Sequence, residues 1–311
     1  MKRIINKIKN RLEIKRAFKA ASFVLDNGKY LIKGKTFTLL SNNQKEKGFV
    51  VKVKSSHKFE IKINKGRVNI TPYKILLMND SVVFSFIRKE ERYYNIKNNV
   101  INLINKLPYK TMDADFFDED CLVVSNVIKG IQIDDEEHLW KFIDHYFDSI
   151  KLDYIESNEM DMNNNIAVVL FYPQHGDCHP WNIFWNKDEP VLIDLDDIDS
   201  YPLFYDIFYY IIAAKHEDAF SFFKASSFRS IFERFCVTNK LNNEVDNIDY
   251  YLSAYVYYWV NKMTPRMNYH EIYFYMQWFI NADLSSFPLV ENAINQYKIN
   301  LNKLRIKNEK R

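Results

Sequence analysis

The stretches HGDCHPWNIFW (residues 175–185) and VLIDLDDIDSYPLFYDI (residues 191–207) decide how this sequence is interpreted. They place His, Asp and Asn side chains among large apolar residues, directly after the apolar run VVLFYP (residues 168–173). Buried polar groups must be hydrogen-bonded, and buried charges must be paired or bound to a metal. The pattern therefore indicates a polar site inside a folded protein.

The spacing of three polar residues is chemically specific. Asp177 precedes Asn182 by five residues, and Asp194 follows Asn182 by twelve, in a strand-like segment. Phosphoryl transfer needs an acid that accepts the proton of the attacking hydroxyl, and oxygen ligands for the magnesium ions that bridge the nucleotide phosphates. The kinase catalytic loop has the same separation between its base and its metal-binding Asn. This spacing predicts phosphoryl transfer.

The motifs in residues 175–210 resemble those of the aminoglycoside phosphotransferase and choline kinase family, whose members have a protein-kinase-like fold. The resemblance implies ATP and magnesium as cofactors. It also implies one role for each matching residue: Asp177 as catalytic base, Asn182 and Asp194 as magnesium ligands, His175 as a residue that orders the loop, Asp196 as a second acid of the hairpin, and Asp206 as a structural brace.

The rest of the chain is compatible with this architecture. Residues 29–87 alternate between apolar and polar in strand-like segments, residues 88–107 have helical periodicity, and the chain is helical in pattern from Phe204 onward. We therefore expect an α+β, protein-kinase-like two-lobed fold, with a small antiparallel β lobe that has one crossing helix and a larger, mostly helical lobe. The expected divisions are a basic helix over 1–25, a nucleotide lobe over 26–128, and a helical lobe over 129–311 with a catalytic loop at 175–182 and a metal-binding hairpin at 191–197.

The expected nucleotide lobe departs from the family pattern in several places. The segment CLVVSNVIKG resembles the hinge strand that holds adenine, through backbone groups of Ser125, Asn126 and Val127. Relatives carry a phosphate-binding Lys on the strand before the crossing helix, where this chain has Ser85. The candidates to replace it are Lys52, Lys74 and Lys89, and the turn around Gly66 is a candidate to cover the nucleotide. A nucleotide lobe that has lost such groups also fits a pseudokinase that acts by interaction.

Composition limits the class of protein. The 311 residues are 47% hydrophobic, which predicts a folded chain, and the 43 basic and 40 acidic residues are too balanced for a nucleic-acid coat. The three cysteines are widely spaced, so neither a disulfide framework nor a cysteine zinc site is indicated. No run of 18 apolar residues occurs, and we expect a cytoplasmic protein.

Residues 1–21 form a basic segment with eight Lys or Arg and one Glu. Ile4, Ile8 and Leu12 recur at helical spacing beside Ile5, which predicts a basic amphipathic helix. Such a helix can lie on an anionic membrane surface, at the inner face of the membrane, or can dock on the rest of the protein with a basic outer face.

The acceptor and two alternatives stay open at this stage. The resemblance implies a hydroxyl acceptor, on a small molecule or a cell-envelope glycan, although the motifs also resemble a stress-response branch that phosphorylates protein Ser or Thr. A cationic acceptor could use the acids Asp197, Asp199, Glu217 and Asp218. A non-haem iron oxygenase would instead use His175, Asp177 and His179, with His216 as the distant ligand.

Overall fold

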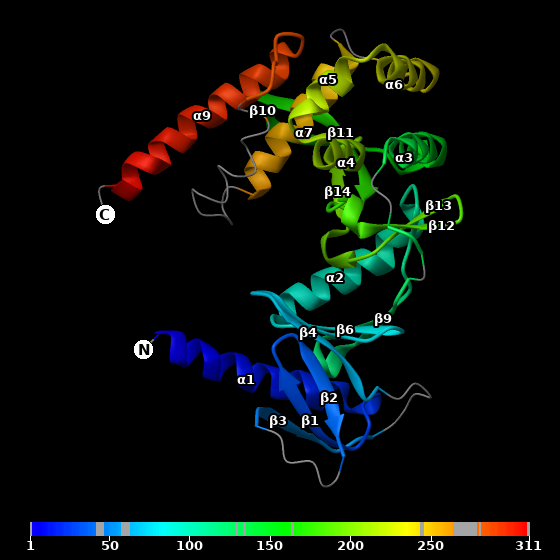
Figure 1. The fold of residues 1–311 in the computed structure, drawn as a ribbon. Helices are drawn as coiled ribbons and strands as arrows, with labels where there is room; N and C mark the ends of the chain where they lie inside the picture. The colour runs from blue at the N-terminus through cyan, green and yellow to red at the C-terminus, as the bar shows by residue number, and fades with distance from the viewer. Residues whose placement is uncertain are drawn as a thin grey trace. The chain divides into compact units, whose positions relative to one another are not determined.

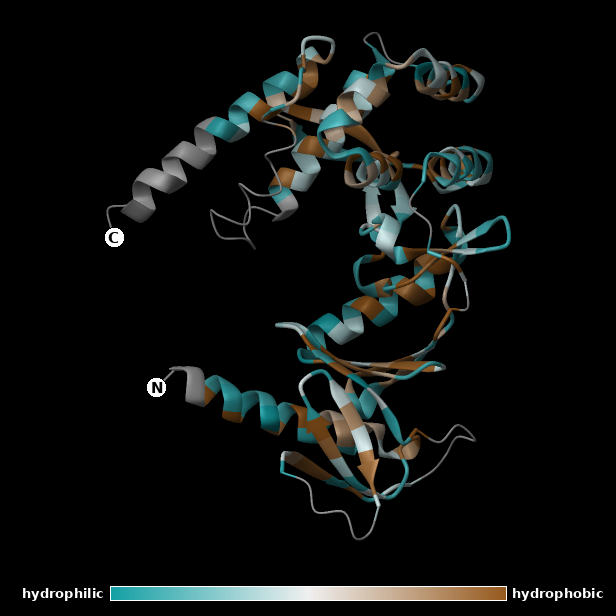
Figure 2. Cartoon of the chain, in the orientation of Figure 1, coloured by the Kyte–Doolittle hydropathy of each residue, from teal (hydrophilic) through white to brown (hydrophobic). Residues whose placement is uncertain are grey.

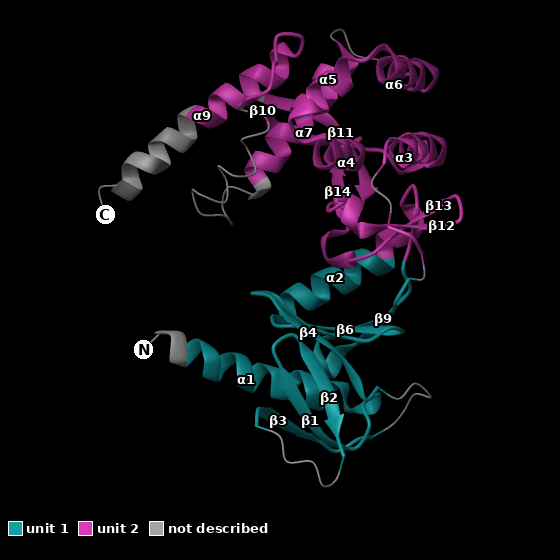
Figure 3. Ribbon diagram, viewed as in Figure 1, with its two compact units in different colours: residues 1–101, 112–129 teal, residues 102–111, 130–311 magenta. Residues whose placement is uncertain are grey.

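The computed structural model describes residues 2–41, 47–56, 63–128, 130–132, 135–162, 165–242, 246–263, 279 and 281–309. The chain divides into two compact units (Figure 3). The first unit contains residues 1–101 and 112–129, and the second contains residues 102–111 and 130–311. The expected division at 1–25, 26–128 and 129–311 differs from this one, because residues 1–25 and 129 belong to the first unit and residues 102–111 belong to the second.

Eight strands of the described residues form one antiparallel sheet in the first unit (Figure 1). Their order is β3-β1-β2-β4-β5-β6-β9-β8, and each neighbouring pair is antiparallel. The strands are β1 (Gly28–Lys33), β2 (Thr36–Leu40), β3 (Phe49–Val53), β4 (Lys65–Ile70), β5 (Lys74–Met78), β6 (Val82–Ile87), β8 (Ala114–Phe117) and β9 (Leu122–Asn126). The strand-like alternation of residues 29–87 is confirmed wherever the structure describes it, and residues 57–62 lie outside the described residues.

The core of the first unit lies between this sheet and helix α1 (Lys2–Ala20). Phe18 of α1 is fully buried, with its ring centroid 5.4 Å from that of Tyr30 and 5.2 Å from that of Phe37. The Tyr30 hydroxyl donates to the Ile63 carbonyl at 2.8 Å, so the one polar atom of this large side chain is satisfied. Burial of such aromatic side chains is the main stabilising contribution expected here.

The helix between β6 and β8 begins and ends near its expected limits. Helix α2 (Glu90–Leu103) is followed by a 3-10 turn (Ile104–Lys106) before Pro108, and Tyr93, Ile96 and Val100 form its buried face. The Tyr93 hydroxyl donates to Asp118 at 2.8 Å. The expected crossing helix is thus present.

The second unit combines helices with two small sheets. In its described part the sheets have the orders β10-β11-β14 and β12-β13-β7. The strands are β7 (Lys110–Thr111), β10 (Glu156–Met162), β11 (Asn165–Gln174), β12 (Ile183–Asn186), β13 (Glu189–Leu192) and β14 (Asp199–Pro202), and the helices are α3 (Glu136–Ser149), α4 (Tyr205–Lys215), α5 (Ala219–Lys224), α6 (Ser226–Thr238), α7 (Asn247–Met263) and α9 (Pro288–Glu309). The mixture of mainly antiparallel sheets and helices confirms the α+β class, although β13 and β7 pair in parallel. The β10–β11 hairpin is not predicted by the sequence pattern.

Aromatic packing fills the helical part of the second unit. Tyr251 and Tyr255 of α7 are buried, and their rings lie against those of Phe204 and Tyr205 at the start of α4. Among the described residues no helix is long and apolar enough to cross a membrane.

Candidate active site

Asp177 and Asn182 lie in contact in the loop between β11 and β12. The Asn182 Nδ2 group donates to the Asp177 carboxylate at 3.0 Å and to the Asp177 carbonyl at 3.0 Å. A 3-10 turn (Pro180–Asn182) makes this contact possible, because the His179 side chain caps it by accepting from the Trp181 N–H at 3.1 Å. Asn182 therefore presents its amide nitrogen to Asp177, which leaves its amide oxygen for another partner.

The β12–β13 hairpin brings Asp194 to the same loop. The Ile193 N–H donates to the Asn182 carbonyl at 2.9 Å, and His175 Nε2 lies 2.8 Å from the Ile193 carbonyl. Asp194 follows directly with φ of +65°, a left-handed conformation that Asp adopts more readily than most residues. The structure thus gathers His175, Asp177, Asn182 and Asp194 at one loop and one hairpin of the second unit.

Asp206, in the first turn of α4, holds the start of the loop. Its carboxylate accepts from the His175 N–H at 2.7 Å, from the Gly176 N–H at 2.9 Å, and from the Tyr109 hydroxyl. Burial raises the pKa of Asp206, and these hydrogen bonds oppose that rise. Burial, followed by the charge of Asp206, raises the pKa of Tyr109. Asp206 is positioned to fix the loop backbone, in keeping with the bracing role implied by the resemblance.

Gly176 is required by its conformation and its surroundings. Its φ is +82°, and a Cβ atom at this position would lie 2.0 Å from the Tyr201 hydroxyl. The Tyr201 hydroxyl itself donates to the Asp197 carbonyl at 2.5 Å, next to Asp196 in the turn Leu195–Asp197. Any side chain at position 176 would displace this ring and the acidic turn.

Three residues that were not predicted from the sequence contact the loop or Asp206. Tyr109 donates to Asp206, and the Gln174 side chain accepts from the Asp206 N–H at 2.9 Å. The Tyr209 hydroxyl donates to the second oxygen of the Asp177 carboxylate at 3.0 Å. Tyr209 lies one helical turn after Asp206, so helical spacing could have identified it. No sequence signal links Tyr109 to the loop.

Tyr209→Phe is expected to lower turnover moderately, because the variant removes one of the two side-chain donors to Asp177 and leaves the ring in place. Loss of one hydrogen bond to a charged group predicts a fall of about tenfold in kcat, with KM for nucleotide unchanged. Steady-state kinetics measure both. Tyr250→Phe is the matched control, since it removes a hydroxyl that donates to the Val168 carbonyl away from the loop. Equal kcat values for the two variants would contradict a positioning role for Tyr209.

The iron ligands of the alternative interpretation are not brought together. Residues 175–179 form a loop and not a strand, so side chains do not alternate on one face as that interpretation assumed. The buried His175 ring lies against the Ile193 carbonyl, and the His179 ring packs on Trp181 at 4.8 Å between centroids. The described residues contain no group of three or more His, Cys, Asp or Glu side chains that could hold a metal ion.

The three expected hinge residues lie at the end of β9 in the first unit. Ser125 is buried between Val83 of β6 and Ala114 of β8. The Val127 N–H donates to the Ser81 carbonyl at 2.9 Å. The Val127 N–H is therefore already used in a backbone hydrogen bond next to β6.

The sheet order separates the three lysines that are candidates to replace the phosphate-binding Lys of relatives. Ser85 lies in the middle of β6, paired with Leu76 and Val123. Lys74 begins the neighbouring strand β5 opposite Ile87, whereas Lys52 lies on β3, the far edge strand of the sheet. Lys89 is exposed just after β6. Lys74 is thus the candidate on the strand that pairs with β6.

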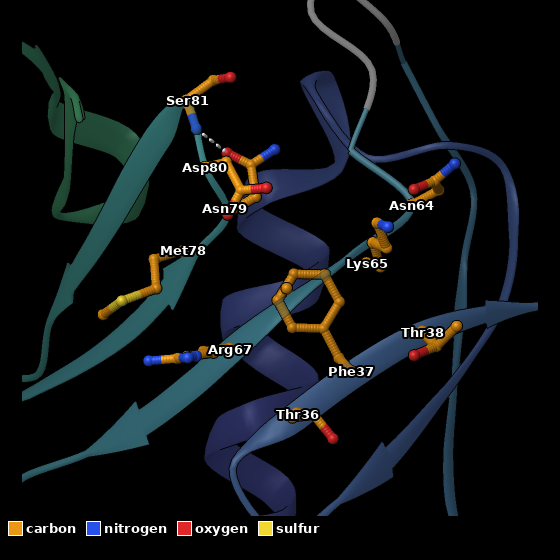
Figure 4. A pocket seen from close by; sticks show the side chains of 11 residues that line it. Thr36, Phe37, Thr38, Asn64, Lys65, Arg67, Met78, Asn79, Asp80 and Ser81 are labelled. Carbon is orange, nitrogen blue, oxygen red and sulfur yellow. Dashed lines mark hydrogen bonds between the residues drawn. The ribbon is translucent and has the colours of Figure 1, made fainter. Parts of the chain in front are cut away.

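Gly66 does not lie in a turn, which corrects the expectation that it could cover a nucleotide. It sits inside β4, opposite Phe37, where a Cβ atom would lie 2.1 Å from the Met78 carbonyl. Glycine is needed here because the backbone of β5 and the Phe37 ring approach closely. The residue lines a cavity of about 600 Å³ at the ends of β2, β4 and β5 (Figure 4).

This chain is similar to one family model and to two solved structures. No curated protein matches the chain. Among solved structures, the amicoumacin kinase hAmiN, in complex with AMP-PNP, Ca²⁺ and Ami, is 12% identical, with 65% of this chain and 81% of that chain covered and a TM-score of 0.36. The choline kinase LicA from Streptococcus pneumoniae is 13% identical, with 73% and 90% covered and a TM-score of 0.38. The model of the phosphotransferase enzyme family matches residues 171–228, the segment that holds the loop, the hairpin and Asp206. The resemblance inferred from the sequence is thereby confirmed over residues 171–228, which are similar to the phosphotransferase enzyme family.

Proposed function

We propose that the protein is an ATP- and magnesium-dependent phosphotransferase that moves the γ-phosphate to a hydroxyl of a small molecule or a cell-envelope glycan. The observation that carries the proposal is the contact between Asp177 and Asn182, inside the segment that matches the phosphotransferase family. A catalytic acid followed five residues later by a metal-binding amide is the arrangement of the kinase catalytic loop.

Asp177 is proposed as the catalytic base. Its carboxylate accepts from Asn182 on one oxygen and from Tyr209 on the other, so the side chain is held in one orientation. A fixed carboxylate can align an acceptor hydroxyl and take its proton as the oxygen attacks the phosphorus. Asp206 acts through the backbone of His175 and Gly176, and is proposed as a positioning residue.

Asn182 and Asp194 are proposed to hold magnesium. Their donor atoms are an amide oxygen and a carboxylate, which are the hard oxygen ligands that magnesium prefers. The neighbouring thiol of Cys178 is fully buried, and burial raises its pKa, so it is not a competing ligand. When bound, magnesium would neutralise negative charge on the nucleotide phosphates.

The nucleotide is proposed to use the end of β9, with the base at Ser125, Asn126 and Val127, and Lys74 as the cation for the phosphates. Ser85, where relatives carry a Lys, also favours a second candidate, a pseudokinase that binds nucleotide without transferring phosphate. The phosphotransferase and the pseudokinase would both bind nucleotide, but only the phosphotransferase would transfer phosphate.

The acceptor is proposed to meet the surface beside Asp177. The Trp181 side chain is 69% exposed there, and the Gln132 side chain donates to the Trp181 carbonyl at 2.7 Å. A large exposed ring held through its backbone is suited to pack against a sugar or another cyclic acceptor. The acidic residues Asp197, Asp199, Glu217 and Asp218 would serve if the acceptor is cationic.

Transfer of label from γ-labelled ATP to a panel of acceptors tests the proposal. The panel contains aminoglycosides, choline, free sugars, cell-envelope glycan and a protein substrate mixture, each with and without magnesium. We expect magnesium-dependent labelling of at least one hydroxyl compound. Nucleotide binding with no labelling of any acceptor, and no release of ADP, would favour the pseudokinase.

A further inference from the structure

Helix α1 has two apolar faces, and only one of them is used by the first unit. Ile14, Ala17 and Phe18 are buried in the core against the sheet. Ile5 and Ile8 in the earlier turns are 56% and 54% exposed, and so is Leu12 at 56%. Hydrophobic residues appear as brown patches among hydrophilic teal along this helix (Figure 2).

The two faces point in nearly opposite directions. At about 100° per residue, Ile5, Ile8 and Leu12 fall within about 60° of one another. The centre of this group lies about 160° around the helix from the centre of Ile14, Ala17 and Phe18. The helix therefore docks on the sheet through Ile14, Ala17 and Phe18, and the face that carries Ile8 and Leu12 is exposed. We call Ile5, Ile8 and Leu12 the outer stripe.

Basic side chains border the outer stripe on both sides. By the same helical geometry, Lys9 and Arg16 lie on one side, Arg11 and Lys15 on the other, and Lys19 continues the stripe toward the sheet. All five are exposed.

The acidic residue of the helix lies away from the outer stripe. Glu13 lies beyond Lys9 and Arg16, about 105° around the helix from the centre of the outer stripe. Its carboxylate is 2.7 Å from the Arg88 guanidinium near the start of α2. The face that carries the outer stripe therefore contains only positive charges.

We propose that the outer stripe and its basic border bind the surface of a bilayer that contains anionic lipids. A narrow apolar stripe between two rows of Lys and Arg matches an interface in which apolar side chains enter the acyl boundary while the cations meet lipid phosphates. The C-terminal half of α1, fixed in the core, would attach the first unit to that surface. The proposal is independent of the proposed enzymatic function.

Vesicle cosedimentation of the full chain tests the proposal. We expect binding to vesicles of phosphatidylglycerol and phosphatidylcholine, weak or no binding to phosphatidylcholine alone, and release at high salt because the attraction is screened. The triple variant Ile5→Ser, Ile8→Ser, Leu12→Ser is expected to lower the partition coefficient about tenfold or more. Ile101→Ser is the matched control, since this residue of α2 is 59% exposed and lies outside the stripe.

A second variant tests whether the basic side chains that border the outer stripe contribute to vesicle binding. Lys9→Gln, Lys15→Gln, Arg16→Gln is expected to weaken binding to the anionic vesicles about tenfold or more, whereas Lys65→Gln, Arg67→Gln on β4 is expected to leave binding unchanged. Because all these side chains are exposed, the thermal midpoint of each variant should match that of the parent, which excludes misfolding. Absence of binding to anionic vesicles, or binding unaffected by the stripe variant, would overturn the proposal. A change of oligomeric mass in the stripe variant without vesicle binding would instead identify a second copy as the partner.

Discussion

Asp177→Asn is expected to lower kcat for phosphate transfer by about 10²–10⁴-fold, because the amide cannot accept the proton of the acceptor hydroxyl. The shape of the side chain is retained, and Asn182 and Tyr209 can still contact it, so the fold should be unchanged. Release of ADP in the presence of an acceptor measures the rate, and circular dichroism with thermal unfolding checks the fold.

The control for this substitution is Asp188→Asn, in the turn of the β12–β13 hairpin. The Asp188 side chain is 89% exposed and lies 3.8 Å from Lys141, so its removal should leave both rate and stability unchanged. If Asp177→Asn retained the turnover of the Asp188 variant, Asp177 would not be the base.

Asp206→Ala is expected to destabilise the second unit strongly. The variant leaves the Gly176 N–H and the Tyr109 hydroxyl without their acceptor at a fully buried position, and leaves the His175 N–H with only the Tyr109 oxygen as acceptor. Each unsatisfied buried donor costs about 1–3 kcal/mol, so we expect a loss of about 3 kcal/mol or more in the free energy of unfolding. Urea denaturation of the purified variant measures this loss.

Asp206→Asn serves as the milder companion variant. Its amide oxygen can still accept a hydrogen bond, whereas an NH₂ group replaces the second carboxylate oxygen. The free energy of unfolding of Asp206→Asn should lie between that of the parent and that of Asp206→Ala. The exposed residue Asp199, which accepts from the adjacent Ser200 N–H, gives the control Asp199→Ala. A cost below about 1 kcal/mol for Asp206→Ala would show that the loop does not depend on this carboxylate.

The local motifs of the site could be predicted from the sequence because short-range spacing fixes them. Asp177 and Asn182 are five residues apart and are joined through one capped turn, so their contact follows from local geometry. Tyr109 could not be predicted, since it reaches Asp206 from 97 residues earlier in the chain. Long-range contacts of this kind depend on how the helices and sheets pack and not on spacing.

The sequence patterns predicted which segments are helices and strands better than they predicted which neighbouring elements each face packs against. Helical periodicity identified α1 correctly, but two apolar faces on one helix made the docking face ambiguous, and the packing of Phe18 on Tyr30 and Phe37 resolves it. Gly66 suggested a turn, yet it is needed within a strand because another strand and an aromatic ring approach its Cα. The β10–β11 hairpin was missed because β10 is mostly exposed and lacks an apolar face.

Thermal unfolding with ATP, ADP and GTP, each with and without magnesium, tests the central claim most directly because it needs no known acceptor. A ligand that binds only the folded state raises the midpoint by mass action. The account predicts a magnesium-dependent rise with ATP that is lost in Asp194→Ala and retained in Asp188→Ala. No rise with any nucleotide, with or without magnesium, would contradict the assignment of Asp177, Asn182 and Asp194 to a phosphotransferase site.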